Sequence, residues 1–82
     1  MDPGSDLVGT EVTFEPATNS ERSAIAAARV RGARWIVHRV AAVEAGRLKG
    51  VRCAFVRALI PGTTVCVDWR WVPVDRLTVI PS

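Results

Sequence analysis

Apolar and polar positions alternate along residues 65–80, which read VCVDWRWVPVDRLTVI. The bulky apolar residues occupy every second position: Val65, Val67, Trp69 and Trp71. Successive side chains of a strand point to opposite faces of the sheet, so this pattern predicts a strand with one apolar, tryptophan-bearing face turned to the interior. Pro73 lacks the N–H that a ladder needs. We therefore expect the strand to end there and a short last strand to begin after a turn at residues 75–76.

The same period of two predicts three earlier strands. In residues 8–16, Val12 and Phe14 share the apolar face of a half-buried strand. Residues 34–43 read RWIVHRVAAV and are rich in residues that suit a pleated surface. Strict alternation divides that stretch into two faces, one with Trp35, Val37, Arg39, Ala41 and Val43, the other with Ile36, His38, Val40 and Ala42.

Residues 51–60, VRCAFVRALI, form the next predicted strand. Its two faces hold Val51, Cys53, Phe55 and Leu59 on one side, and Arg52, Ala54, Val56, Ala58 and Ile60 on the other. Before it, the loop EAGRLKG leaves Gly46 free to adopt a positive φ. After it, Pro61-Gly62 has the order of a type II turn.

Residues 17–32 allow two interpretations. Thr18 and Glu21 have the spacing of a capping box, with Ser20 as an alternative N-cap. Four alanines favour a short helix near residues 19–31, and Gly32 can end it. However, Ile25 and Val30 are its only large apolar residues. A loop followed by a strand at residues 28–31 is therefore the competing interpretation.

About five short strands with turn signals between them predict a mainly β fold, a small antiparallel barrel or sandwich. The length of 82 residues corresponds to one domain. We assign residues 7–82 to this domain and residues 1–6, which show no periodic pattern, to a disordered tail.

Two stretches resemble known small barrels. WVPVDRLTVI resembles the close of SH3-like and Tudor-like barrels, in which a strand, one tight helical turn and a short last strand complete the barrel. The positions concerned are Trp71, Val72, Pro73, Val74, Asp75, Arg76, Leu77 and Val79. RVRGARWIVHRV resembles the first hairpin of barrels attached to bacterial helicase-like proteins. These resemblances imply an SH3-like barrel and a bacterial or phage context.

Composition narrows the class of function. The net charge is +3, and ten of the eleven basic residues are arginine, either because arginine binds phosphate well or because the coding sequence is GC-rich. Cys53 and Cys66 lack C-x-x-C spacing, which favours free thiols over a disulfide between neighbouring strands. With one histidine they do not make a zinc site, so we expect no metal and no cofactor. The chain has no signal-peptide pattern and no apolar run that could span a membrane, which predicts a cytoplasmic protein.

Catalytic patterns are missing from the sequence. His38 is the only histidine, and no nucleophile motif lies near it. The carboxylates form no pair typical of metal or glycosidase chemistry, and the glycines form no phosphate-binding loop. We therefore expect a protein that is not an enzyme, with His38 as a sheet residue.

The clearest functional signal is a run of arginines around one tryptophan. It contains Arg29, Arg31, Arg34, Trp35 and Arg39 within eleven residues. Guanidinium groups bind phosphate and aromatic faces stack on unpaired bases, so the run predicts a site for DNA or RNA. In the competing interpretation, Trp35 and Trp71 are core residues, as tryptophans at barrel positions more often are, and the arginines only solvate the outer face. A second candidate surface, for a partner, consists of Trp69, Arg70 and Trp71.

Three hypotheses follow. The first is a nucleic-acid-binding barrel, favoured by a positive face around Arg31, Arg34 and Arg39. The second is a protein-interaction module, favoured by an exposed patch containing Trp69 or Val72. The third is a self-associating subunit of a phage or mobile-element assembly, a homodimer joined edge to edge.

Overall fold

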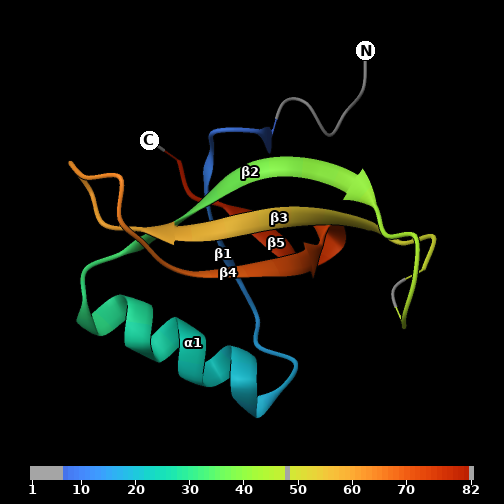
Figure 1. Ribbon diagram of the computed structural model, residues 1–82, viewed down its shortest axis with the longest axis horizontal. Coiled ribbons are helices and arrows are strands. Elements are labelled where there is room, and N and C mark those ends of the chain that lie inside the picture. Colours follow the sequence, from blue (N-terminus) through green and yellow to red (C-terminus); the bar gives the residue numbers. More distant parts are fainter. Residues whose placement is uncertain (1–6, 48, 82) are drawn as a thin grey trace.

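A computed structural model of the chain describes residues 7–47 and 49–81; the tail assigned to residues 1–6 lies outside them. Five strands and one α-helix follow each other along the chain (Figure 1). The elements are β1 (Glu11–Phe14), α1 (Asn19–Val30), β2 (Arg34–Ala42), β3 (Arg52–Leu59), β4 (Cys66–Pro73), the 3-10 turn η2 (Val74–Arg76) and β5 (Leu77–Val79). The mainly β prediction is confirmed, and so is the helix within residues 19–31.

The strands form a single antiparallel sheet in the order β4-β3-β2-β1-β5. Within the described ranges, no pairing joins β4 to β5, so the sheet is open. The expectation of a closed barrel is therefore not confirmed. The local order β4, η2, β5 does match the strand, tight turn and short strand expected at this end of the chain.

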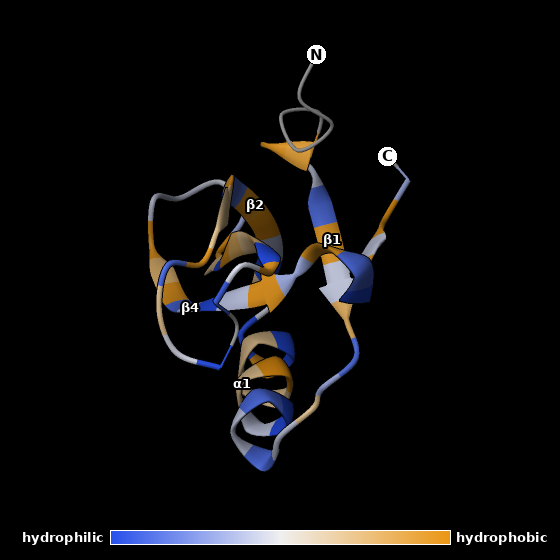
Figure 2. Ribbon diagram, turned by 90° about the vertical axis from the view of Figure 1, so that its right-hand side faces the viewer, coloured by the Kyte–Doolittle hydropathy of each residue, from blue (hydrophilic) through white to orange (hydrophobic). Residues whose placement is uncertain are grey.

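The hydrophobic core lies between α1 and one face of the sheet, with α1 below the strands in both views (Figures 1 and 2). We call this face of the sheet the inner face and its opposite the outer face. Phe14 and Trp35 meet edge to face, with ring centroids 5.3 Å apart. The helix contributes the buried side chains of Ala24 and Ala28 to this core, and Ile25 packs partly buried against it. The other buried members of the core cluster are Val12, Val37, Ala54, Val56, Ala58 and Val72.

A β-bulge interrupts β2, so the strict alternation predicted for this strand is wrong after Val37. Val37 pairs with Val56, but Arg39, not His38, pairs with the next residue of β3. The extra residue in the bulged strand shifts the phase of all residues after it. Val40 therefore packs against the core, and Arg39 leaves the face that Trp35 and Val37 occupy.

The predicted orientation of β4 is wrong. The register aligns Val72 with buried Ala54, and Trp71 with Phe55 on the outer face. Val72 is completely buried, whereas Trp69 keeps 58% of its surface exposed. The interior is thus lined by valine, alanine, Phe14 and Trp35, and the two tryptophans of β4 lie on the outer face.

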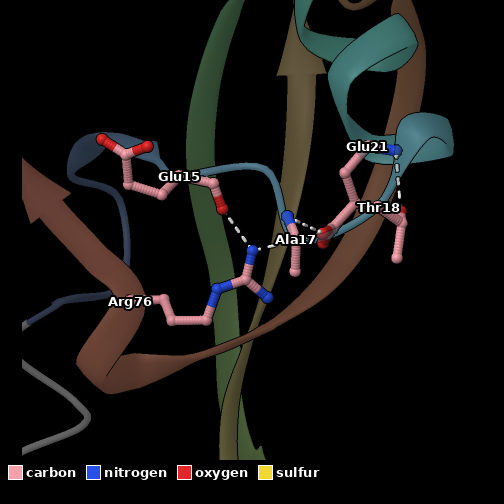
Figure 3. A network of polar contacts seen from close by, with 5 residues as sticks. All are labelled: Glu15, Ala17, Thr18, Glu21 and Arg76. Carbon is pink, nitrogen blue, oxygen red and sulfur yellow. Dashed lines mark hydrogen bonds and ion pairs between the residues drawn. The ribbon is translucent and has the colours of Figure 1, made fainter.

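A polar network fixes the start of α1 against the end of the sheet (Figure 3). Thr18 Oγ1 accepts a hydrogen bond from the Glu21 amide at 3.1 Å, as the capping prediction required. Glu21 Oε1 accepts from the Ala17 amide at 2.8 Å and lies 3.2 Å from Arg76 Nη2. Arg76 Nη2 also donates to the Glu15 carbonyl. The helix start is therefore tied to η2, more than fifty residues later in the chain.

Two glycine turns form as expected. Gly46 has φ +85° in the loop after β2, and Gly62 has φ +80° in the turn after β3. The turn is closed by the Thr63 amide, which donates to the Ile60 carbonyl at 3.1 Å. Cys53 and Cys66 are both free thiols, the first buried and the second exposed. Burial, and secondly the negative charge of Asp75, raise the pKa of Cys53.

Candidate aromatic and basic binding face

Three aromatic side chains meet on the outer face, across β3 and β4. Phe55 is the central ring, with its centroid 5.5 Å from that of Trp69 and 5.1 Å from that of Trp71. All three are outward-facing because Phe55 pairs with Trp71 and Trp69 pairs with Arg57 in the antiparallel register. Trp69 is the most exposed, and the other two are half-buried. We call these three rings the aromatic cluster.

Cationic and polar groups from β2 border the aromatic cluster. The guanidinium carbon of Arg39 lies 5.4 Å from the ring centroid of Trp71, in cation–π distance. The His38 ring meets Phe55 edge to face at 5.9 Å. A hollow of about 230 Å³ lies between His38, Arg39, Phe55 and Trp71. It is smaller than the pockets that enclose a drug-sized ligand, which begin near ~300 Å³, so it suits a ligand resting on the surface.

The β2 bulge explains why two neighbouring residues reach the same cluster. In a regular strand His38 and Arg39 would point to opposite faces. Because the bulge sets both against the single residue Phe55 of β3, both side chains lie on the outer face. The ring contacts of His38 with Phe55 and of Arg39 with Trp71 agree with that arrangement.

Arg57 adds a further guanidinium on the other side of Phe55. It lies between Ile36 of β2 and Trp69 of β4 in the sheet register. Its Nε is buried and has no hydrogen-bond partner in the described part of the chain. Arg57 therefore lies on the outer face at the position paired with Trp69, with part of its side chain buried against the sheet.

The arginine run predicted from the sequence does not form one surface. Arg29 lies in the last turn of α1 and Arg31 caps that helix, whereas Arg39 lies on the outer face. Arg34 begins β2 and forms an ion pair with Glu11 at 3.6 Å. All four of these arginines are exposed.

Trp35 is only 7% exposed and packs against Phe14 in the core. Its ring has no free face for a base, so of the two interpretations the structure bears out the core one. The tryptophan that is exposed is Trp69 of β4.

The second predicted surface is divided between the two faces of β4. Trp69 and Trp71 belong to the aromatic cluster. Arg70 aligns with buried Val56 and so points to the inner side of this edge strand, where its Nη2 lies 3.6 Å from Asp68 Oδ2. The exposed patch that contains Trp69 therefore does not include Val72, which is buried.

Phe55, Arg57 and His38 were missed as surface residues. In the sequence, Phe55 and Arg57 alternate with alanine and valine, but this pattern does not show which of the two faces of the strand is buried in the core. The signal that could have located them is the pairing of β3 with β4, which places Phe55 between two tryptophans.

The chemistry available on this face is stacking and anion binding. In residues 7–47 and 49–81, no group of three or more His, Cys, Asp or Glu side chains could hold a metal ion. Among the paired residues of β1, β2, β3 and β4, the acidic residue on the outer face is Glu11. Its carboxylate forms an ion pair with Arg34. The described part of the chain contains no helix with the length and apolar character needed to cross a membrane.

No protein-family model, curated protein or solved structure matches this chain.

Proposed function

We propose that this protein is a non-enzymatic module that binds single-stranded nucleic acid on its outer face. The observation that carries the proposal is the aromatic cluster of Phe55, Trp69 and Trp71, with the Arg39 guanidinium 5.4 Å from one of its rings. Aromatic side chains stack on unpaired bases, and arginine neutralises the phosphates between them. Single strands are favoured because the bases of a duplex already stack on each other and present mainly phosphates to a flat surface.

The charge of the face argues against a cationic ligand. Aromatic clusters also bind quaternary and methylated ammonium groups through cation–π contacts. Here the cation next to Trp71 is already supplied by Arg39. A second cation would be repelled by Arg39 beside Trp71 and by Arg57 on the same face of the sheet, whereas a phosphodiester would be attracted to both. An anionic chain with planar bases therefore fits this face better.

We also propose that this chain is a member of the SH3-like barrels. Its support is the order of β4, η2 and β5, together with an antiparallel meander from β1 through β2 and β3 to β4. Against a simple SH3-like pattern stand the helix α1 between β1 and β2 and the open sheet. A solved structure in which β4 and β5 close the sheet would support this classification.

The test is fluorescence anisotropy of a labelled oligo-dT against the same length of duplex, at several salt concentrations. We expect tighter binding to the single strand, with a log–log salt slope of about −1.4 to −2 if two or three phosphates are contacted, since each contributes about −0.7. Trp69→Ala should weaken binding by about 1–3 kcal/mol, which is about 5- to 150-fold.

Two arginine variants distinguish the outer face from a general effect of charge. Arg39→Ala and Arg31→Ala remove the same charge, but only Arg39 lies by the aromatic cluster. We expect Arg39→Ala to weaken binding and to reduce the salt slope by about 0.7, and Arg31→Ala to have a much smaller effect. Equal losses in both variants, or no binding at low salt, would refute the proposal.

A protein partner is the alternative function, favoured by the 58% exposure of Trp69 on an edge strand. Tryptophan is enriched among residues that dominate binding energy at protein interfaces. In that case Trp69→Ala would abolish capture of a protein while the anisotropy titration with oligo-dT stayed flat for the wild-type chain.

A further inference from the structure

The strand β4 leaves one side unpaired. It ends the sheet order, and its eight residues pair only with β3 in the described part of the chain. An open hollow of about 1190 Å³ lies beside this edge. It is lined by residues 68–71, by Glu21 of α1 and Arg76, and by the end of β2 with the β2–β3 loop. An exposed edge of this length presents unpaired backbone N–H and C=O groups, which are a template for another strand.

The hydrogen bonds show which backbone groups face outward. The Trp69 amide donates to Oδ1 of its neighbour Asp68 at 2.7 Å and is therefore not used in the ladder with β3. In an antiparallel pair the backbone groups of alternate residues point to the same side. The backbone of Trp71 thus shares the free edge with that of Trp69, whereas Pro73 has no N–H to offer there.

The side chains along this edge are self-complementary. β4 reads CVDWRWVP, with an acid and a base on either side of Trp69. If a second β4 pairs antiparallel about a two-fold axis at Trp69, Asp68 of each copy lies opposite Arg70 of the other. Opposite charges at directly opposed positions stabilise strand pairs, and like charges destabilise them.

We propose that two copies of this chain associate through β4, in an antiparallel pairing centred on Trp69. The result is a continuous ten-stranded sheet with closed two-fold symmetry. Because the axis runs perpendicular to the sheet, both outer faces point the same way, and the two Trp69 rings become neighbours. The association does not depend on nucleic acid, and its test contains none.

Two existing contacts are exchanged when the dimer forms. Asp68 gives up the Trp69 amide, which then joins the new ladder, and its pairing with Arg70 of the same chain is replaced by pairing with Arg70 of the second copy. The contact within the chain is long, at 3.6 Å, and both side chains are about one third exposed, at 32% and 31%. Such pairs are weak, so little opposes the exchange.

The first measurement is sedimentation of the wild-type chain from micromolar to millimolar concentration. We expect the mass to rise from 8.9 kDa towards twice that value. A chain that stays monomeric throughout this range overturns the proposal and leaves the edge to a different partner. This measurement needs no variant and so does not depend on any variant folding.

Mixing two charge-reversal variants tests the register. Asp68→Arg alone places arginine opposite arginine across the axis, and Arg70→Asp alone places aspartate opposite aspartate. We expect each variant alone to be monomeric and an equimolar mixture to form a heterodimer, because each reversed side chain then meets an opposite charge. The contact within one chain is lost in both variants and cannot produce this result.

The mixing experiment has one outcome that supports the pairing about Trp69 and one that contradicts it. Heterodimers in the mixture that dissociate with added salt support pairing about Trp69. If wild type dimerises but the variants dimerise alone as strongly as in the mixture, the pairing proposed here is wrong. Arg29→Asp, on the exposed side of α1, serves as the matched control and should dimerise like the wild type.

Discussion

The carboxylate of Glu21 should make the fold sensitive to acid. It accepts the Ala17 amide at 2.8 Å and lies 3.2 Å from the Arg76 guanidinium, and its side chain is only 12% exposed (Figure 3). Burial raises the pKa of Glu21, but the hydrogen bond from Ala17 and the contact with Arg76 outweigh burial and lower it below 4.5. The replacement Glu21→Gln keeps the size of the side chain and removes the charge.

The size of the effect follows from these contacts. A hydrogen bond to a charged group contributes about 1.5–3 kcal/mol. The Arg76 side chain is 28% exposed, so solvent screens its part, and we expect Glu21→Gln to cost about 1–2 kcal/mol at pH 7. The folded protein holds Glu21 ionised more strongly than the unfolded chain does. Its contribution is therefore complete above the unfolded pKa of about 4.5 and is lost as the pH falls through the folded value.

Urea unfolding at a series of pH values tests this. The free energy of unfolding should differ between wild type and Glu21→Gln at pH 7, and the difference should shrink once the pH falls below about 4.5. Glu15→Gln is the matched control, since only the backbone carbonyl of Glu15 takes part in the network. A difference that stays constant down to low pH would show that Glu21 acts by packing and not by charge.

Other predictions concern α1 and the two faces of the sheet. Ala27→Pro, at an exposed position inside α1, should destabilise by about 3 kcal/mol and Ala27→Gly by about 1 kcal/mol; equal melting temperatures for wild type and the proline variant would exclude the helix. Val72→Ala should cost about 1–3 kcal/mol in urea unfolding, because its side chain is fully buried. Trp35→Ala should cost about 3–5 kcal/mol and Trp69→Ala within about 0.5 kcal/mol, and comparable losses would contradict the assignment of inner and outer faces.

Local signals in the sequence predicted local structure well. Thr18 and Glu21 identify the helix start because the cap satisfies backbone groups within a few residues of each other. Even there the detail differs, since the Glu21 carboxylate binds the amide of Ala17 and a guanidinium far along the chain, and not the Thr18 amide of a regular capping box. The alternation around Val12 and Phe14 also predicted the buried face of β1 correctly.

The buried face of the sheet could not be predicted because both faces of β3 carry apolar residues, and in β4 the alternation points to the tryptophan face although the buried residue is Val72 on the face that also carries Asp68 and Arg70. Tryptophan is bulkier than valine, which favoured Trp71 over Val72 as the core residue. The decision lies in the cross-strand register, which aligns Val72 with buried Ala54, and in the side of the sheet against which α1 packs. Neither the register nor the side on which a helix packs is encoded in a single strand.

The β-bulge at His38 links the stability of the core to the chemistry of the outer face. Without it, strict alternation would place Arg39 on the inner face with Trp35 and Val37, and burying an unpaired guanidinium in an apolar core is costly. With it, Val40 fills the inner position and Arg39 moves beside Trp71. The same insertion brings His38 against Phe55. The requirement for an uncharged core therefore accounts for a basic group beside the aromatic cluster. Deleting His38 removes only the extra residue of the bulge, so Val40 should stay inside and Arg39 outside, and binding to oligo-dT should be largely retained.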